Sequence, residues 1–150
     1  GGVLDSIRPL MRAEFAWSRE QGPEHLQLYR LLTGDCRRLA TTVACHQEIA
    51  GDSVLSVGML AEFDQTLAEG RWLYRRLFWE AGMIGQVLYL EAEAAGLRGT
   101  GIGCYFDDAV HEVCGLTGTA FQSLYHFTLG GARTDRRIQT LPAYSHLHRS

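Results

Sequence analysis

The 150-residue sequence predicts an α+β fold, an α/β sandwich in which helices cover a sheet. Two segments rich in β-branched and aromatic residues, 54–63 and 121–129, are typical of strands. Between them, the segment Arg71–Ala95 repeats apolar side chains at helical spacing. The order of strand, long helix, strand-like loop, helix and strand indicates helices packed on a sheet.

The N-terminal third predicts short elements. Residues 4–20 have the loosely helical apolar spacing of a first helix, and residues 26–32 are a short apolar run typical of a strand or a turn. Asp35 is placed to cap a helix that continues to about Gln47. A turn is expected over residues 50–53, because Gly, Asp and Ser follow one another there.

The middle of the chain predicts a buried strand followed by a long central helix. Residues 54–63 are apolar and β-branched at their start, which is typical of a buried strand. The helix Arg71–Ala95 is apolar around most of its circumference, so we expect it to be covered on several sides. Gly82 and Gly85 lower helix propensity and therefore indicate close backbone approach. Packing within one subunit and a seam between two subunits both explain them.

The last third predicts a strand-like loop, a helix and a strand. Gly96 is expected to end the long helix. Residues 100–105 are typical of a short strand or strand-like loop, and a second helix begins at residues 106–108, with one aspartate as its cap. This helix should stop at Gly115, and residues 121–129 form the last strand.

Composition and charge exclude several functional classes. The chain has 14 Arg, no Lys and 17 acidic residues, which give a net charge of −3. Nucleic-acid-binding proteins usually carry a net positive charge instead, so this class is not expected. No apolar run approaches the roughly 20 residues that span a bilayer, and no leader sequence is recognised. We therefore expect a cytoplasmic protein with no membrane or nucleic-acid partner. Without Lys, Schiff-base chemistry is excluded.

The sequence predicts no metal site. The four cysteines lack the Cys-x-x-Cys spacing of metal centres, and they are Cys36, Cys45, Cys104 and Cys114. We expect free thiols in a reducing compartment. His111 and His126 have no second ligand at metal spacing, so we interpret them as structural histidines with satisfied hydrogen bonds.

The segment 96–108 is the most informative part of the sequence. Its first eight residues contain four glycines, which let a backbone approach a flat or phosphorylated ligand. The spacing Gly99-x-Gly101-x-Gly103 does not match the dinucleotide-binding fingerprint, and a P-loop would require a lysine. From the residues alone, ligand contact and a plain tight turn both remain open.

The same region resembles a known family. The sequence WEAGMIGQVLYLEAEAAGLR (79–98), continued by GTGIGCYFDDAVHEVCGL and FQSLYHFTLGGA, resembles the C-terminal half of the nitroreductase superfamily. It is most similar to the SagB-type dehydrogenases, which include azoline oxidases of peptide-modifying pathways. Supporting matches lie at residues 28–30, 45–52 and 137–144.

The resemblance divides the chain into three parts and implies a function. The parts are an N-terminal helical segment of unclear match (1–23), the nitroreductase-like region (24–144) and a tail (145–150). The family resemblance implies an FMN-dependent oxidoreductase that transfers a hydride or two electrons. Its substrate would be a small molecule or derived from a peptide, and the flavin itself would carry the chemistry.

The resemblance also implies positions for the cofactor and the partner. The family is homodimeric, so the helix Arg71–Ala95 would form the dimer core. Backbone amides of Gly101, Ile102 and Gly103 would contact the flavin ring. Arg137 would bind the FMN phosphate, although a solvated arginine explains it equally well. No catalytic side chain is identified.

The sequence departs from the family at its N-terminal end. A complete family domain begins with an Arg-Arg-Ser-x-Arg segment that binds the flavin phosphate, and Arg8 and Arg12 do not match it. We therefore expect the N-terminal part of the domain to be missing. The chain would then be a fragment, half of a split assembly, or a domain that has lost FMN. The alternative function is a non-catalytic dimerisation or interaction module on a truncated nitroreductase-like fold.

Overall fold

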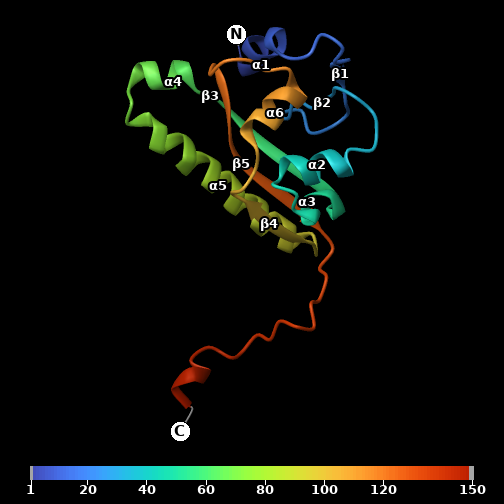
Figure 1. Cartoon of the computed structure of the whole chain (residues 1–150), viewed down its shortest axis with the longest axis vertical. Helices are drawn as coiled ribbons and strands as arrows, with labels where there is room; N and C mark the ends of the chain where they lie inside the picture. The colour runs from blue at the N-terminus through green and yellow to red at the C-terminus, as the bar shows by residue number, and fades with distance from the viewer. Residues whose placement is uncertain (1, 149–150) are drawn as a thin grey trace.

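A computed structural model describes residues 2–148 of the chain (Figure 1). Its centre is a three-stranded antiparallel sheet with the order β3-β5-β4, made of β3 (Leu55–Glu62), β5 (Phe121–Gly130) and β4 (Arg98–Ile102). The long helix α5 (Leu73–Ala94) covers one side of this sheet, and three shorter helices cover the other. This arrangement confirms the predicted α+β sandwich.

The helix α5 confirms the expected long helix, but only one of its faces is covered within the chain. It ends before Gly96, whose φ of +71° is the left-handed conformation that glycine adopts most readily. The buried positions recur every four or seven residues on the face toward the sheet, and they are Leu73, Leu77, Ala81, Gly85 and Ala92. Trp79 and Met83 are 65% and 62% exposed, so burial around the whole circumference is not seen in one chain.

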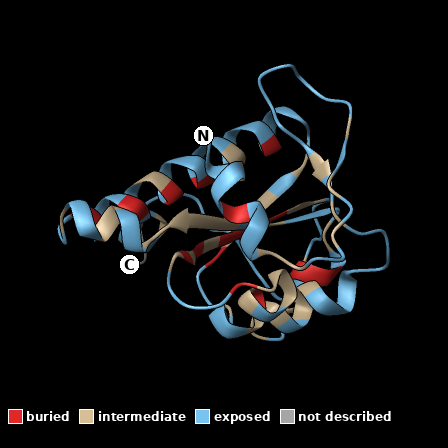
Figure 2. Cartoon of the chain, turned by 90° about the horizontal axis from the view of Figure 1, so that it is seen from above, coloured by how far each residue is buried: buried red, intermediate tan, exposed pale blue. Residues whose placement is uncertain are grey.

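The strand β3 lies where it was expected but is not buried. It pairs only with β5, because it stands at one edge of the sheet, and every residue of β3 retains some exposure. The central strand β5 contributes the most buried side chain, Phe127, which is 0% exposed. Figure 2 shows the buried residues gathered along the central strand and the inner face of α5. An apolar run indicates a strand but does not distinguish an edge from a centre.

The three shorter helices are α2 (Arg37–Val43), α3 (Glu48–Asp52) and α6 (Asp107–Cys114). The helix expected to continue to Gln47 ends at Val43, because Cys45 and His46 take φ angles of +54° and +59° that no helix contains. The following residues form α3, where a turn was expected.

Short-range signals at the ends of α2 and α6 are partly confirmed. Cys36, and not the expected Asp35, is the N-cap residue of α2, and no side chain caps this helix. Asp35 lies one residue earlier and accepts a hydrogen bond from the Arg37 amide at 3.0 Å. The N-cap position of α6 is occupied by Phe106 and not by an aspartate, and its side chain makes no capping hydrogen bond. The aspartates instead lie in the first turn, where the helix dipole favours them. Gly115 ends α6 with a φ of +77°.

The N-terminal segment contains α1 (Val3–Ile7), the 3-10 helix η1 (Arg8–Leu10), β1 (Ser18–Arg19) and β2 (Tyr29–Arg30). The helix expected over residues 4–20 therefore ends at Leu10. Pro9 cannot donate a hydrogen bond and restricts the residue before it, which limits the helix to its first turns. The strands β1 and β2 pair with each other, and Ile7 packs against Leu116 and Phe121.

Two further segments were not anticipated as regular elements. The helix α4 (Asp64–Glu69) connects β3 to α5. After β5, residues 131–144 form an arm that extends away from the sheet and leads to η2 (Ser145–His148), as Figure 1 shows. Gly1 and residues 149–150 of the predicted tail lie outside the described residues. Among residues 2–148, no helix has the length and apolarity to cross a bilayer.

Candidate functional site

The glycine-rich segment forms the strand β4 and the loop that follows it. The strand β4 is an edge strand, paired with β5 alone, and it ends at Ile102. Residues 103–106, here called the β4–α6 loop, connect it to α6. A loop at the open edge of a sheet presents backbone groups that no neighbouring strand uses.

The three predicted flavin contacts occupy different environments. The Gly101 amide donates a hydrogen bond to the Tyr89 hydroxyl at 2.7 Å, so this donor is already used within the chain. Ile102 is only 3% exposed. Gly103 is exposed, and a Cβ atom built there would meet no atom within 4 Å. Of the three, Gly103 is the residue presented at the surface.

Unpaired backbone donors continue beyond Gly103. The amides of Gly103, Cys104 and Tyr105 find no hydrogen-bond acceptor in residues 2–148, whereas the next amide, that of Phe106, donates to the Val43 carbonyl at 2.9 Å. Backbone amides are strong donors that require water or a ligand when no protein group accepts them. The β4–α6 loop can therefore bind acceptor atoms along the edge of a flat ligand.

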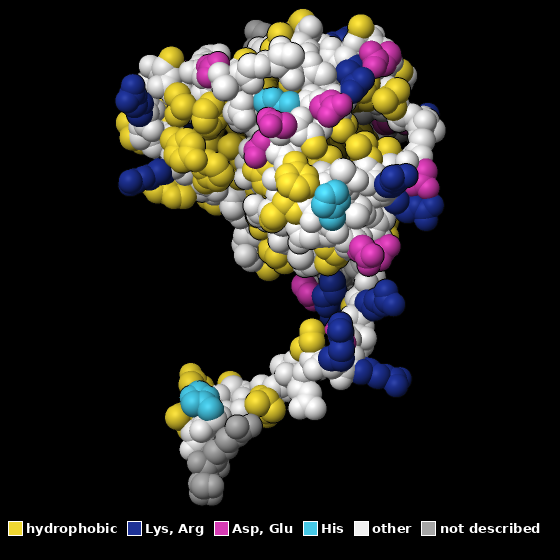
Figure 3. Space-filling view, viewed as in Figure 1, with side chains coloured by type: hydrophobic (Ala, Val, Ile, Leu, Met, Phe, Trp, Pro, Cys, Tyr) yellow, Lys and Arg dark blue, Asp and Glu magenta, His cyan; other side chains and the backbone are white. Residues whose placement is uncertain are grey.

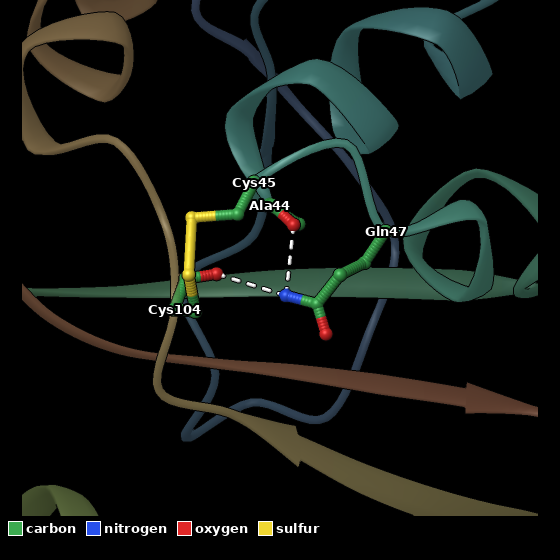
Figure 4. The surroundings of a disulfide bond; sticks show 4 residues. All are labelled: Ala44, Cys45, Gln47 and Cys104. Carbon is green, nitrogen blue, oxygen red and sulfur yellow. Dashed lines mark hydrogen bonds between the residues drawn. A yellow bond between two sulfur atoms is a disulfide. The ribbon is translucent and has the colours of Figure 1, made fainter.

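A disulfide fixes this loop to the turn between α2 and α3, residues 44–47 (Figure 4). The bond joins Cys45 to Cys104, with 5.9 Å between their Cα atoms. The Gln47 side-chain amide donates to the Cys104 carbonyl at 3.0 Å and to the Ala44 carbonyl at 2.8 Å. The backbone of the loop is therefore held before any ligand arrives.

The expectation of four free thiols is wrong for this pair. Cys36 and Cys114 are free, but Cys45 and Cys104 are bonded. The two bonded residues are 59 positions apart, and no local spacing marks them as partners. Only the packing of α2 and α3 on β4, through the buried cluster of Ala44, Ala50 and Ile102, brings them together.

Arg137 lies on the C-terminal arm rather than beside the loop. Its side chain is 89% exposed, and it donates two short hydrogen bonds to Asp135, at 2.6 Å and 2.9 Å. These hydrogen bonds lower the pKa of Asp135. Figure 1 shows the arm leaving the domain. The structure of one chain thus does not bring Arg137 to Gly103, and it tests neither residue as a ligand.

A buried histidine lies behind the loop, on the floor of a cavity of about 530 Å³ between the sheet, α2 and α6. His126 is 7% exposed, its Nε2 atom is 2.9 Å from the Ser123 hydroxyl, and the Tyr105 ring stacks on it at 4.3 Å. Burial lowers the pKa of His126, and the nearby charge of Asp107 opposes this shift. The expected hydrogen bond of this histidine is therefore present.

His111 differs from that expectation. Its Nε2 atom is buried and finds no hydrogen-bond partner in the described part of the chain, so the prediction of a satisfied histidine is wrong here. The reason is positional, since the sequence places His111 on a helix but does not show which atoms surround its ring.

Comparisons with known proteins agree with the architecture. No family model matches the sequence, and no curated protein matches it. A solved structure described as a candidate nitroreductase from Anabaena variabilis is 31% identical, with a TM-score of 0.62, over 71% of this chain and 21% of its own. A candidate oxidoreductase from Bacteroides fragilis is 14% identical, with a TM-score of 0.52, over 73% of this chain and 50% of its own.

The chain therefore spans about a fifth of the first of these proteins and about half of the second. The second likeness shows the fold alone, because its identity is low. The first similarity, together with the long helix packed on the antiparallel sheet, supports the nitroreductase superfamily. The fold of this chain is nitroreductase-like.

Proposed function

We propose that this chain is part of an FMN-dependent oxidoreductase of the nitroreductase or SagB-type azoline dehydrogenase class. The observation that carries the proposal is the β4–α6 loop, with unpaired amides at Gly103, Cys104 and Tyr105 on a nitroreductase-like fold. The structural neighbours, a candidate nitroreductase and a candidate oxidoreductase, support a general oxidoreductase function. FMN, when bound, would accept and return a hydride, with a small or peptide-derived molecule as substrate.

The residues present fit the ring of a flavin. The loop offers consecutive donors, and the space in front of Gly103 is open, so a planar ligand can approach the backbone. Gly101 and Ile102 would support the loop without contacting the ring directly. The Gly101 amide already donates to the Tyr89 hydroxyl, and the Ile102 side chain is buried. Since the disulfide holds the loop in place, little ordering would accompany ligand binding.

The phosphate side of the site requires a further movement or a second chain. Arg137 would supply the positive charge for the FMN phosphate, as the resemblance implies. It is bound to Asp135 on the arm, so it would have to exchange that partner for the phosphate. The arm that carries Arg137 extends away from the domain (Figure 1), so in this role it would have to move toward its own loop or reach the loop of another copy.

The outer face of α5 supports the proposal of a homodimer. Steps of seven, four and seven residues place large apolar side chains on one face, here called the α5 stripe: Trp72, Trp79, Met83 and Leu90. Each of them is more than 60% exposed, and Figure 3 shows hydrophobic side chains gathered over this part of the molecule. A contiguous patch of this kind is typical of an interface. We propose that two copies pack along Arg71–Ala95.

A non-catalytic dimerisation module is the second candidate. The α5 stripe favours association whether or not FMN is bound, and Arg137 lies away from the loop in a single chain. This candidate predicts a colourless protein that dimerises and does not bind added FMN.

The deciding experiment compares two substitutions of Gly103 in the full chain. Gly103→Pro removes the backbone donor, whereas Gly103→Ala retains it and has open space for its methyl group. Binding is followed through the visible absorption and the fluorescence of titrated FMN. We expect Gly103→Ala to bind FMN like the unchanged protein and Gly103→Pro to bind it about three- to tenfold more weakly, the loss of one hydrogen bond.

Two results contradict the proposal. An unchanged protein that does not bind added FMN would support the dimerisation module. Equal affinities for the proline and alanine variants would show that the Gly103 amide does not contact the flavin.

A further inference from the structure

We propose that Cys45 and Cys104 form a thiol–disulfide exchange site, at which an external dithiol opens the bond and releases the β4–α6 loop. The two cysteines lie on connections between elements, the α2–α3 turn and the loop itself, as Figure 4 shows. Cys104 is exposed, whereas Cys45 is partly buried. We therefore expect a reductant to attack on the Cys104 side of the bond.

The exchange balances in atoms and electrons. A thiolate of the dithiol attacks the Sγ atom of Cys104, the S–S bond breaks, and Cys45 departs as a thiolate. The second thiol of the reagent then displaces Cys104 and closes the reagent's own disulfide. Two electrons pass from the dithiol to the protein, and its two protons end on Cys45 and Cys104.

The backbone around Cys45 indicates that the bond restrains an unfavourable conformation. Cys45 and His46 have consecutive φ angles of +54° and +59°, in the left-handed region that residues with a Cβ atom rarely adopt. The disulfide and the Gln47 side chain both hold this turn against the loop. Opening the bond removes one of these restraints and lets the turn relax toward ordinary backbone angles.

The consequences of opening are confined to the loop and the α2–α3 turn. The buried cluster of Ala44, Ala50 and Ile102 does not include either sulfur, and it continues to hold α2 and α3 on the sheet. The Phe106 amide keeps its acceptor, the Val43 carbonyl. The segment between Ile102 and Phe106, which carries the unpaired amides, loses its covalent anchor. We also expect FMN to bind the reduced protein more weakly, an expectation that rests on the proposed function.

The test uses the full chain with Cys36→Ser and Cys114→Ser, so that only the bonded pair remains. The protein is treated with dithiothreitol at increasing urea, quenched in acid and labelled with a maleimide, and its intact mass gives the number of free thiols. Chymotrypsin cleavage at Tyr105 and Phe106 reports on the loop, and cleavage at Tyr144 on the exposed arm is the internal control. Adding Cys45→Ser to this background gives a permanently open form.

We expect the pair to be reduced without urea, and the loop to be cut about tenfold faster or more after reduction, with cleavage at Tyr144 unchanged. The Cys45→Ser form should behave like the reduced protein and should not respond to dithiothreitol. Reduction that begins only when urea unfolds the chain would overturn the proposal, as would equal cleavage of the loop in both forms. Two labelled thiols before any reductant would also overturn it.

The consequence for FMN is read separately by fluorescence titration of the oxidised and reduced forms. Binding that weakens about threefold or more on reduction supports control of the flavin site by the disulfide. Equal affinity overturns that control. If neither form binds FMN, the proposed function fails, and the mass and cleavage results still decide whether the exchange site exists.

Discussion

Contacts of single residues decide which backbone donors at the end of β4 are free. The Tyr89 hydroxyl accepts the Gly101 amide, so Gly101 supports the strand and Gly103 faces outward. Position 101 favours glycine for a steric reason, because a Cβ atom there would overlap the Tyr125 hydroxyl and force this side chain to shift. At position 103 the same atom would meet open space.

This difference predicts unequal effects of the same substitution at Gly101 and Gly103. Gly101→Ala should lower the free energy of unfolding by about 1–3 kcal/mol, because Tyr125 must move to admit the methyl group. Gly103→Ala should change it by less than about 0.5 kcal/mol. Urea denaturation followed by circular dichroism measures both. Similar losses at the two positions would mean that Tyr125 does not occupy the space beside Gly101.

The buried histidine predicts a pH dependence of stability. Because burial lowers the pKa of His126 in the folded chain, the unfolded chain, with an ordinary pKa of about 6.5, binds a proton at a higher pH. The contribution of His126 to the free energy of unfolding should therefore be complete above about pH 6.5 and decrease as the pH falls toward the pKa of the folded state. A His126→Gln variant should lose this part of the slope in urea titrations between neutral and mildly acidic pH. An unchanged slope would assign it to other groups.

At the scale of elements, α5 approaches the sheet closely at Gly85 but not at Gly82. A Cβ atom at Gly85 would lie 2.8 Å from the Tyr125 ring, whereas one at Gly82 would meet nothing within 4 Å. The sequence indicates close approach at both glycines. The structure of the chain shows it at Gly85 alone, since Gly82 is on an exposed side of the helix.

These surroundings predict that the two alanine variants differ in sign. Gly82→Ala should raise the free energy of unfolding by up to about 1 kcal/mol through helix propensity. Gly85→Ala should lower it, since the Tyr125 ring must yield. Urea denaturation at one low protein concentration compares them. If Gly82→Ala instead destabilises the protein and weakens association, a partner helix approaches at Gly82.

At the scale of the whole molecule, two apolar surfaces are left exposed by the packing of a single chain. The α5 stripe is apolar and exposed, and the C-terminal arm carries further exposed apolar side chains, among them Ile138, Leu141 and Tyr144. Both lie outside the three core clusters of the domain. The proposed homodimer would cover the α5 stripe.

A charge placed in the α5 stripe should therefore disrupt association. Met83→Arg would bury a guanidinium without a partner, so we expect the dimer to weaken about tenfold or more. Gln65→Arg, at an exposed position of α4, is the matched control and should leave the mass unchanged. Light scattering over a range of protein concentrations measures the mass. A dimer that withstands Met83→Arg would place the interface elsewhere.

Local patterns of the sequence determined the regular elements that depend on neighbouring residues. The long helix and its end at Gly96, the helix that stops at Gly115, and the strands near 55–62 and 121–130 follow from apolar spacing and from glycine's access to positive φ. The cofactor, the dimer and the four predicted site residues stay predictions, because they concern contacts outside one chain.

The tertiary structure alone decided how distant segments meet. It placed β3 at an edge, joined Cys45 to Cys104 across 59 residues, and separated the used amide of Gly101 from the unpaired amide of Gly103. It also placed Arg137 on an arm away from the loop. The physical reason is shared by all of these features. Each depends on which atoms lie opposite one another after packing, and periodicity along the chain does not encode that partner.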